Sequence, residues 1–273
     1  TVLVRAVELG LRPLAFSVDN GWADPRADSN IMNLVETLKV PFYRYVINRT
    51  KFVDLQNVFM KAGLINIEIP TDHILMAASL EMAQKYGIKW IISGGNVTTE
   101  SIMPPSWGYS ARDLTHIKDV YKKMTGKKLI GLPTCSLFKW NLYRWWYGIK
   151  TFYLLDYFDY NREDSIKMLE DKYGYKPYGD KHCENVFTSW FQNYYLFEKF
   201  GIDKRKAHYA SLINSGQMIR SEAMELLKQN PVYPKIGLEE KIWKYPKQED
   251  SAFLTDEKLY NVIAKTVKEL GWK

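Results

Sequence analysis

Residues 88–100 read "IKWIISGGNVTTE", a short apolar run that leads into a glycine-containing polar loop. The run is typical of a buried strand, and Gly94 and Gly95 follow where that strand ends. Glycine has no side chain to block the backbone amides, so such a loop can approach an anion such as phosphate. The loop matches neither G-x-G-x-x-G nor G-x-x-x-x-G-K-[ST]. The residues alone therefore leave two interpretations open, a phosphate-binding loop and a structural turn.

Strands and helices alternate on both sides of this run. Further strands are expected in "RPLAFSVDN" (12–20), "PFYRYVI" (41–47) and "TFYLLDY" (151–157). Apolar residues at helical spacing predict helices at 1–10, 30–38, 52–62, 73–86 and 136–147. Asp28 or Ser29 is the expected N-cap of the helix at 30–38. Strands that alternate with helices indicate an α/β fold, a doubly wound parallel sheet with helices on both faces.

The chain after residue 160 has a mostly helical pattern. Helical spacing recurs at 161–173, 184–200, 204–214, 220–228 and 255–270. No linker rich in Gly and Ser separates this part from the preceding strands. We therefore expect an α/β domain over residues 1–160 and a helical region over residues 161–273 that packs directly on it.

The net charge and the cysteine content limit the kinds of ligand and the kinds of protein that the sequence fits. The formal net charge of +7 fits an anionic ligand such as a nucleotide, and it also fits nucleic acid. The two cysteines, Cys135 and Cys183, form no C-x-x-C pair, which argues against a disulfide framework and a metal knuckle. No apolar run is long enough to cross a bilayer. We therefore expect a cytoplasmic protein with no membrane span.

Two polar segments fall at the carboxyl ends of expected strands, where ligands bind in parallel sheets. Their polar and glycine residues are Ser17, Asp19, Asn20 and Gly21 in the first, and Ser93, Gly94, Gly95, Asn96, Thr99 and Glu100 in the second. An acidic residue at a strand end can bind a ribose or a metal, and Glu100 can hold Mg²⁺ beside phosphate oxygens. Each segment also reads as a turn, so both interpretations stay open.

The segment "PTDH" places Thr71, Asp72 and His73 at the start of an expected helix. Thr71 or Asp72 can cap the helix by accepting from its first free amides. The same residues can contact an anion or substrate, with His73 as the proton carrier. The two roles can coexist.

Two further segments supply candidate substrate contacts. In "MPPSWGYSARD", Trp107 and Tyr109 can stack on a sugar or base, and Arg112 can pair with phosphate or carboxylate. In "YGDKHCE", Lys181 and His182 are candidate polar contacts, whereas a nucleophilic pair of His182 and its neighbour cysteine is weakly supported, because such a pair needs proximity in space. The basic run "DKRKAH" (203–208) reads as a solvated helix face or as an anion or partner surface.

Six segments, taken in order, resemble the bacterial N-acetyl sugar amidotransferases. They are "FSVDNGW", "DLQNVFMKA", "IEIPTDH", "YGIKWIISGGNVTTESIMPPSWGY", "YGDKHCENVFTSWFQ" and "KFGIDKRKAHYASLINSGQ". These enzymes are PP-loop ATPases of lipopolysaccharide and surface-polysaccharide biosynthesis, and the resemblance runs over nearly the whole chain. It implies an adenine nucleotide α-hydrolase type of sheet with a helical extension.

The resemblance implies a nucleotide site that holds ATP and Mg²⁺. "SVDNG" corresponds to the edge that receives the nucleoside, Thr99 to a phosphate contact and Glu100 to the magnesium ligand. Glu100, Asp72 and His73 are the expected catalytic residues. The family's S-G-G-x-D-S phosphate loop would lie immediately before Thr1, and a cysteine segment that binds Zn²⁺ would lie further upstream, so we expect the sequence to be an incomplete record. One departure is the cysteine that follows His182, where the family is expected to have His or Tyr.

The implied reaction converts the acetamido group of a nucleotide-linked sugar into an acetamidino group. ATP adenylates the acetamido oxygen, and ammonia then displaces AMP. Trp107, Tyr109, Arg112, Lys181 and His182 are the expected contacts of the sugar nucleotide. The ammonia would come from glutaminase and ammonia-channel subunits that resemble the histidine-biosynthesis amidotransferase, with 203–208 as a candidate docking face.

Two other functions fit part of the sequence. A PP-loop RNA-modifying enzyme fits the positive charge, but the expected persulfide or cluster cysteine motif is not found, so nucleic acid is not the expected partner. A non-catalytic scaffold that binds nucleotide or docks the glutaminase fits the missing phosphate loop.

Overall fold

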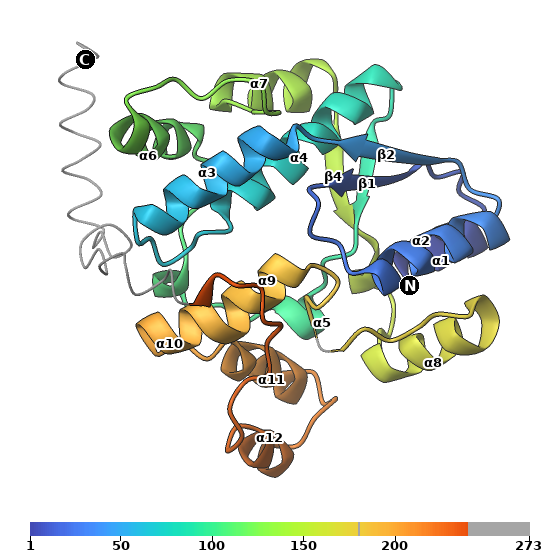
Figure 1. The fold of residues 1–273 in the computed structure, drawn as a ribbon. Helices are drawn as coiled ribbons and strands as arrows, with labels where there is room; N and C mark the ends of the chain where they lie inside the picture. The colour runs from blue at the N-terminus through green and yellow to red at the C-terminus, as the bar shows by residue number, and fades with distance from the viewer. Residues whose placement is uncertain (180, 240–273) are drawn as a thin grey trace.

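The computed structural model describes residues 1–179 and 181–239 (Figure 1). Its strands are β1 (Ala15–Asp19), β2 (Phe42–Val46), β3 (Trp90–Ser93) and β4 (Lys150–Tyr153). β1 pairs in parallel with β2, and β3 pairs in parallel with β4. β1, β2 and β3 lie within stretches that the sequence predicts as strands. β4 begins one residue before the predicted stretch 151–157, and the second half of that stretch forms a 3-10 helix in place of a strand.

The two strand pairs rest on the same helix, α4 (Ile69–Lys85), which contacts both β1 and β3. Within the described residues no ladder of backbone hydrogen bonds joins β1 to β3. The architecture is therefore mixed α/β with parallel strand pairs. The single doubly wound sheet of PP-loop type stays a prediction.

Helices fill most of the remaining chain. The first part contains α1 (Val2–Glu8), α2 (Pro25–Thr37), α3 (Arg49–Lys61), α5 (Val97–Glu100), α6 (Leu114–Thr125) and α7 (Leu137–Asn141), with shorter helical turns η1 (Pro105–Trp107), η2 (Leu142–Trp146) and η3 (Leu154–Tyr157). The second part contains α8 (Arg162–Tyr173), α9 (Val186–Trp190), η4 (Phe191–Tyr195), α10 (Leu196–Phe200), α11 (Lys204–Asn214) and α12 (Arg220–Leu226). The helices expected after residue 160 are confirmed, except that 255–270 lies outside the described residues.

Helix α3 begins three residues earlier than the sequence predicts, and α2 and α4 begin five and four residues earlier. In α2, Asp24 is the N-cap, and its Oδ1 accepts a hydrogen bond of 2.8 Å from the Arg26 amide; a cap at residue 28 or 29 is wrong. In α4, Thr71 and Asp72 lie inside the first turn, so the cap expected there is also wrong. Both α2 and α4 have a proline in the first turn, where the missing N–H costs no hydrogen bond.

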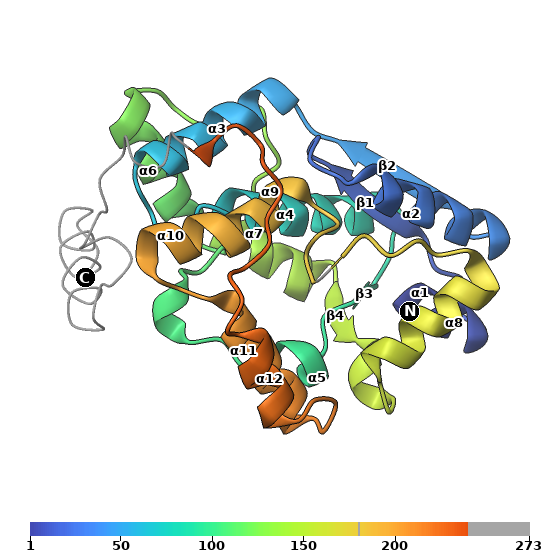
Figure 2. The same ribbon diagram turned by 60° about the horizontal axis from the view of Figure 1, so that its bottom comes forward.

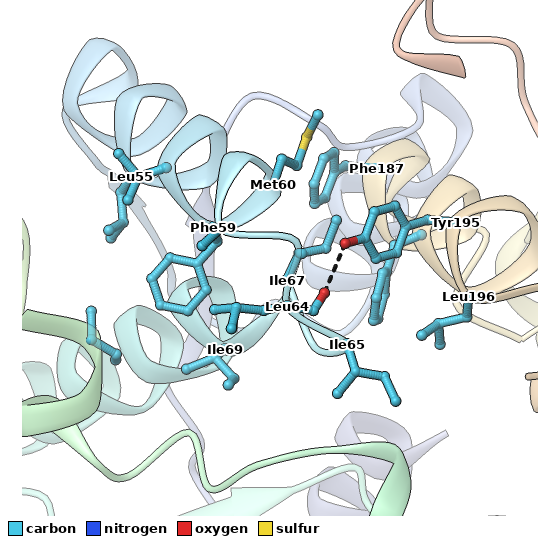
Figure 3. Close-up of a cluster of buried hydrophobic side chains, with 14 of the residues drawn as sticks. Leu55, Phe59, Met60, Leu64, Ile65, Ile67, Ile69, Phe187, Tyr195 and Leu196 are labelled. Carbon is cyan, nitrogen blue, oxygen red and sulfur yellow. Dashed lines mark hydrogen bonds between the residues drawn. The ribbon is translucent and has the colours of Figure 1, made fainter. Parts of the chain in front are cut away.

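The main core joins the two parts of the chain (Figure 3). It packs apolar side chains of α3 and the following loop against the aromatic face of α9, η4 and α10. Phe59 and Ile67 meet Phe187 and Tyr195 there, and all of them are buried. The Tyr195 hydroxyl donates a hydrogen bond of 2.7 Å to the carbonyl of Leu64. Each large apolar side chain removed from water contributes about 1.5–3 kcal/mol, so this seam holds the C-terminal helices firmly.

A second core lies under α7 and η2. Cys135, Tyr143 and Ile149 pack there against Ala77 and Ala83 of α4. Helix α5 contacts α11, and both lie with α12 at one end of the molecule, away from β1 and β2 (Figures 1 and 2). In the part of the chain that the structure describes, no helix is both long enough and apolar enough to span a bilayer.

Candidate functional site

A cavity of about 560 Å³ opens beyond the carboxyl ends of β1, β2 and β3. Asn20 reaches it from the end of β1, Ile47 from the end of β2, and Glu100 from α5, which follows β3. The first turns of α4 and the segment before α9 form its other walls. Its titratable lining residues are Glu68, Asp72, Glu100, Lys181, His182, Glu184, Lys204 and His208. This arrangement places groups far apart in the sequence around one space large enough for a small ligand.

An ion pair links the loop after β3 to the segment before α9. The Lys181 Nζ lies 3.0 Å from Glu100 Oε1 and donates a hydrogen bond of 3.0 Å to the Thr99 carbonyl. Burial lowers the pKa of Lys181, while the charge of Glu100 opposes that shift. The pair therefore places one cation and one carboxylate side by side on the cavity wall.

The glycine loop is held by its own polar groups. Asn96 caps α5, because its Oδ1 accepts from the Thr99 amide at 2.9 Å and from the Thr99 hydroxyl at 3.0 Å. The Ser93 hydroxyl accepts from the Gly95 amide at 3.2 Å. A Cβ on Gly95 would lie 3.3 Å from Glu100 Oε2, so glycine leaves room for that carboxylate. The loop thus acts as a turn that positions Glu100, and phosphate contacts by Ser93, Gly94, Gly95, Asn96 and Thr99 stay a prediction.

Two acidic residues lie one helical turn apart at the start of α4. Glu68 is buried, and its carboxylate accepts from the hydroxyls of Thr71 at 3.0 Å and Thr188 at 2.6 Å. Burial, with the nearby charge of Asp72, raises the pKa of Glu68 to about 7. The protein around Asp72 also raises its pKa, although this side chain still meets water in the cavity and the charges of His182 and Lys204 oppose the shift.

Basic groups face these carboxylates from the other side. Burial lowers the pKa of Lys204 to about 8, with Asp72 opposing that shift. Burial and the neighbouring cations lower the pKa of His208 to about 3, so its ring is neutral at pH 7. The rings of His182 and His208 lie 5.6 Å apart, and His182 Nδ1 is 3.6 Å from Glu184 Oε1. His182 has a φ of 67°, a left-handed conformation that is uncommon outside glycine.

The segment at the end of β1 is a turn with one residue in the cavity wall. Asp19 Oδ1 accepts from the Gly21 amide at 2.9 Å, and Asn20 Oδ1 accepts from the Trp22 amide at 3.1 Å. Gly21 has a φ of 80°, and a Cβ there would collide with the Arg49 side chain. Of the predicted residues in this segment, Asn20 lines the cavity. Ser17, Asp19 and Gly21 are not among the lining residues, and Ser17 lies within β1.

His73 has a structural role in place of the predicted catalytic one. Its ring is buried, with Nδ1 bonded to the Ala111 carbonyl at 2.7 Å and Nε2 accepting from the Cys135 amide at 3.1 Å. Both nitrogens therefore join segments of backbone, and His73 is not among the cavity-lining residues. A proton carrier needs a ring nitrogen that faces the substrate, so we leave His73 out of the site.

The predicted substrate residues separate into two groups. Trp107 lines the cavity together with Lys181 and His182. The Tyr109 hydroxyl instead donates to Asp113 Oδ2 at 2.7 Å, and the Arg112 guanidinium lies 4.6 Å from the centre of the Trp140 ring.

Neither Tyr109 nor Arg112 is among the cavity-lining residues. The structure therefore supports Trp107, Lys181 and His182 as candidate contacts and gives the other two packing roles.

The run 203–208 is not a free basic surface. Lys204 and His208 face the cavity, while Asp203 is buried and paired with Arg205 at 2.7 Å. Arg205 also donates to the carbonyl of Gln229 at 2.8 Å. Most charges of this run are thus used inside the molecule, whereas Lys206 is exposed, and the docking of a partner on this run stays a prediction.

A second cavity, of about 520 Å³, adjoins the first. The two share Lys181, Gln192 and His208 as lining residues. The second is lined on its other sides mostly by polar and aromatic side chains, among them Arg162 and Tyr178. A wall of three polar side chains therefore separates two neighbouring compartments.

Residues 184–273 match a family described as LPS biosynthesis protein WbpG-like, C-terminal domain. The match covers the last third of the chain and relates that part to a domain of lipopolysaccharide biosynthesis proteins. A search of curated proteins found no match. The matched region supplies Glu184, Thr188, Lys204 and His208 to the cavity, so this domain forms one of its walls.

Several lining residues were missed by the sequence analysis. Glu68 interrupts the apolar run "LINIEIP", and a lone carboxylate within such a run is a signal that burial will raise its pKa. Lys204 and His208 were noted only as part of the basic run 203–208, and their place in the cavity wall was not predicted because it depends on how α11 packs. Within the described residues, no cluster of three or more His, Cys, Asp and Glu side chains has the arrangement of a metal site.

Proposed function

We propose that the protein is an ATP-dependent amidotransferase of lipopolysaccharide biosynthesis that converts the acetamido group of a nucleotide-linked sugar into an acetamidino group. The observation that carries this proposal is the meeting of Asp72, Glu100, Lys181 and His182 on one cavity beyond the carboxyl ends of parallel strands. Ligands of α/β sheets bind at that edge. The similarity of the last third of the chain to an LPS biosynthesis domain supports the pathway.

The reaction has two displacements. The acetamido oxygen attacks the α-phosphorus of ATP, an O–P bond forms, and pyrophosphate leaves. Ammonia then adds to the activated imidate carbon, loses a proton, and the C–O bond breaks as AMP departs. An amide oxygen is a poor leaving group, so adenylation is the step that makes displacement by ammonia feasible. The cavity contributes by holding the reacting groups together and by stabilising charge.

Lys181 and Glu100 are the proposed nucleotide-facing pair. The Lys181 ammonium is placed to stabilise negative charge on the phosphates. Glu100 has a side chain that is 41% exposed, with Oε1 on Lys181, so the carboxylate can still accept a further ligand. Mg²⁺ is commonly bound by one or two carboxylates together with substrate phosphates, and Glu100 fits that need. When bound there, Mg²⁺ would offset phosphate charge.

Asp72 and Glu68 are the proposed proton acceptors. A general base works best when its pKa lies near the working pH, and burial raises the pKa of Glu68 to about 7. Asp72 lies one turn further along α4 and opens into the cavity. A carboxylate at this position can take the proton that the attacking ammonia must lose.

The second cavity is the proposed pocket for the sugar nucleotide. Arg162 offers a cation for a diphosphate, and the rings of Tyr178 and Tyr209 offer stacking surfaces. Lys181 and His208 belong to both cavities, so a sugar in the second would meet a nucleotide in the first at this wall. Trp107 and His182 line the first cavity but not the second, so in this proposal they face the nucleotide and not the sugar, which differs from the role expected from the sequence.

Ammonia is the proposed nucleophile, and a separate glutaminase is its proposed source. At neutral pH free ammonia is mostly ammonium, which has no lone pair for attack. The sulfur of Cys135 is buried, and that of Cys183 lies 3.4 Å from the Ser189 hydroxyl. Neither contact resembles the Cys–His pair that a glutaminase needs, so a partner subunit is part of the proposal.

Nucleotide products test the proposal. The full-length protein is incubated with ATP, Mg²⁺, an ammonium salt at mildly alkaline pH and UDP-linked acetamido sugars, and the nucleotides are separated by chromatography. We expect AMP that forms only when both sugar and ammonia are present. Formation of ADP, or AMP release that needs neither sugar nor ammonia, would contradict an adenylated acetamido intermediate.

A further inference from the structure

One stretch of the chain is basic and free of acidic residues. From Val120 to Leu155 there is no Asp or Glu. The basic residues of this stretch are Lys122, Lys123, Lys127, Lys128, Lys139, Arg144 and Lys150, and all of them are exposed. A local excess of this kind creates a positive surface potential that attracts anionic partners.

Large apolar side chains project from the same stretch. In α7 and η2 the exposed fractions are 70% for Leu137, 77% for Phe138, 76% for Trp145 and 80% for Trp146. The opposite side of this helix packs on α4 through residues such as Tyr143. The helix is therefore two-sided, and its outer side exposes apolar area that the fold of this chain does not bury.

Cations alternate with these apolar groups. Lys139 follows Phe138 in sequence, and the Arg144 guanidinium lies 5.6 Å from the centre of the Trp145 ring. At the start of β4, Lys150 Nζ lies 5.4 Å from the centre of the Trp90 ring, which is 56% exposed. Apolar and basic groups thus share one surface, which we call the α7 face and define as Leu137, Phe138, Lys139, Arg144, Trp145 and Trp146.

We propose that the α7 face docks the protein on the surface of a bilayer that contains anionic phospholipids. Trp and Phe side chains favour the boundary between head groups and acyl chains, and Lys and Arg pair with lipid phosphates. Clustered basic residues draw such a face to an anionic leaflet. Charge complementarity therefore identifies the occupant as an anionic membrane, and insertion of the apolar side chains stabilises the bound state.

A bilayer fits this face better than nucleic acid or an acidic protein does. Nucleic acid binds through cations and stacked rings, whereas Leu137 and the edge of Phe138 gain most from an apolar medium. An acidic protein partner would need a complementary apolar groove as well as negative charge. Contact at the surface also agrees with the described residues, in which no helix can cross a membrane.

The geometry leaves the candidate site free of the membrane. Trp90 and Lys150 begin β3 and β4, whereas Glu100 follows the opposite end of β3. In Figure 1, α7 lies on the side of the molecule opposite α11 and α12. A protein docked through α7 would therefore keep its cavities open to soluble substrates.

Vesicle sedimentation tests the proposal. The full-length protein is mixed with vesicles of phosphatidylcholine alone or with a third of phosphatidylglycerol, and bound protein is measured in the pellet. We expect binding to the anionic vesicles that falls about tenfold in Trp145→Ser/Trp146→Ser and in Lys139→Gln/Arg144→Gln. Matched controls are Ile219→Ser/Met224→Ser and Lys167→Gln/Lys172→Gln, which change exposed residues elsewhere and should bind like the unchanged protein.

Two outcomes would overturn the proposal. One is unchanged protein that stays in the supernatant with anionic vesicles. The other is a tryptophan double variant that binds as well as the unchanged protein, since purely ionic attachment would then explain the result. Retention on RNA without binding to vesicles would point to nucleic acid in place of lipid. Far-ultraviolet circular dichroism checks that each variant is folded, which exposed substitutions should allow.

Discussion

The buried carboxylate of Glu68 makes the stability of the folded protein depend on pH. Burial raises its pKa from 4.5 to about 7, because the charged form loses hydration that two hydroxyl donors only partly replace. The folded state therefore holds a proton that the unfolded state releases between these values. The stability due to neutral Glu68 is complete below pH 4.5 and is lost as the pH rises through about 7.

Replacing Glu68 by Gln tests this linkage. The Gln side chain stays neutral at all pH values. Between pH 5 and 8 the free energy of unfolding of the variant should therefore fall less than that of the unchanged protein, and the difference should be on the order of 3 kcal/mol at most. Urea unfolding at several pH values measures the difference. Glu170→Gln, on the exposed side of α8, should follow the unchanged protein. An equal pH dependence in Glu68→Gln and the unchanged protein would show that Glu68 is charged when folded.

Glu100 is the residue on which the proposed reaction depends most. Glu100→Gln keeps the shape of the side chain but removes the charge that would hold Mg²⁺ and pair with Lys181. We expect the rate of ammonia-dependent AMP formation to fall by at least about a hundredfold. Because the side chain is 41% exposed, the midpoint of thermal unfolding should change little. Near-normal turnover in the folded variant would remove Glu100 from the site.

Sequence reasoning at the residue scale worked where a group's role followed from local chemistry. Glu100, Asp72, Lys181 and His182 were singled out as polar residues in segments that read as sites, and all four line the cavity. His73 was misassigned, because the partners that occupy its two nitrogens, Ala111 and Cys135, lie far along the chain. No local pattern reveals such contacts.

At the scale of elements, strands were located better than helix starts. The strands are marked by apolar runs, which a single sequence displays directly. The starts of α2 and α4 were placed too late, because residues inside these helices (Asp28 or Ser29, and Thr71 or Asp72) were taken as caps, although proline in the first turn marked the true beginnings. Proline at that position is a stronger signal than an isolated hydroxyl residue.

The cap of α5 gives a test at this scale. Asn96→Ala removes the acceptor for the amide and hydroxyl of Thr99, so the four-residue helix that positions Glu100 should fray. We expect a loss of about 1 kcal/mol in unfolding free energy and a larger relative loss of AMP-forming activity.

Asn48→Ala is the matched control, because Asn48 caps α3 by accepting from the Lys51 amide at 3.1 Å. It should cost similar stability while activity per folded molecule is kept. Asn96→Asp restores the acceptor and should recover most activity. A variant Asn96→Ala with normal activity would show that the cap does not position Glu100.

At the scale of the whole molecule, long-range packing completes the site. The helices after residue 183 share one core with α3 and the loop that follows it, and they supply one wall of both cavities. The helical periodicity of this region was readable from the sequence. Its position over the carboxyl ends of the strands was not, since it depends on contacts between segments more than a hundred residues apart in the chain, such as Tyr195 with Leu64.

Tyr195→Phe tests whether the two parts unfold together. The substitution keeps the ring in the core but leaves the Leu64 carbonyl without its donor, which should cost about 1–2 kcal/mol. We expect one cooperative transition with a lower midpoint in urea, by fluorescence and by circular dichroism alike. Tyr157→Phe, at a tyrosine that is 73% exposed, is the control. Separate transitions for the two probes would show that the C-terminal helices unfold on their own.

The most direct test of the proposed function is the mass of the sugar product. The full-length protein is incubated with ATP, Mg²⁺, isotopically labelled ammonium and a UDP-linked acetamido sugar, and the sugar is analysed by mass spectrometry. We expect a product in which one oxygen is replaced by labelled NH, formed with equal amounts of AMP and absent with Glu100→Gln. A panel of such sugars that all return unchanged, from protein shown to be folded and to bind ATP, would contradict it.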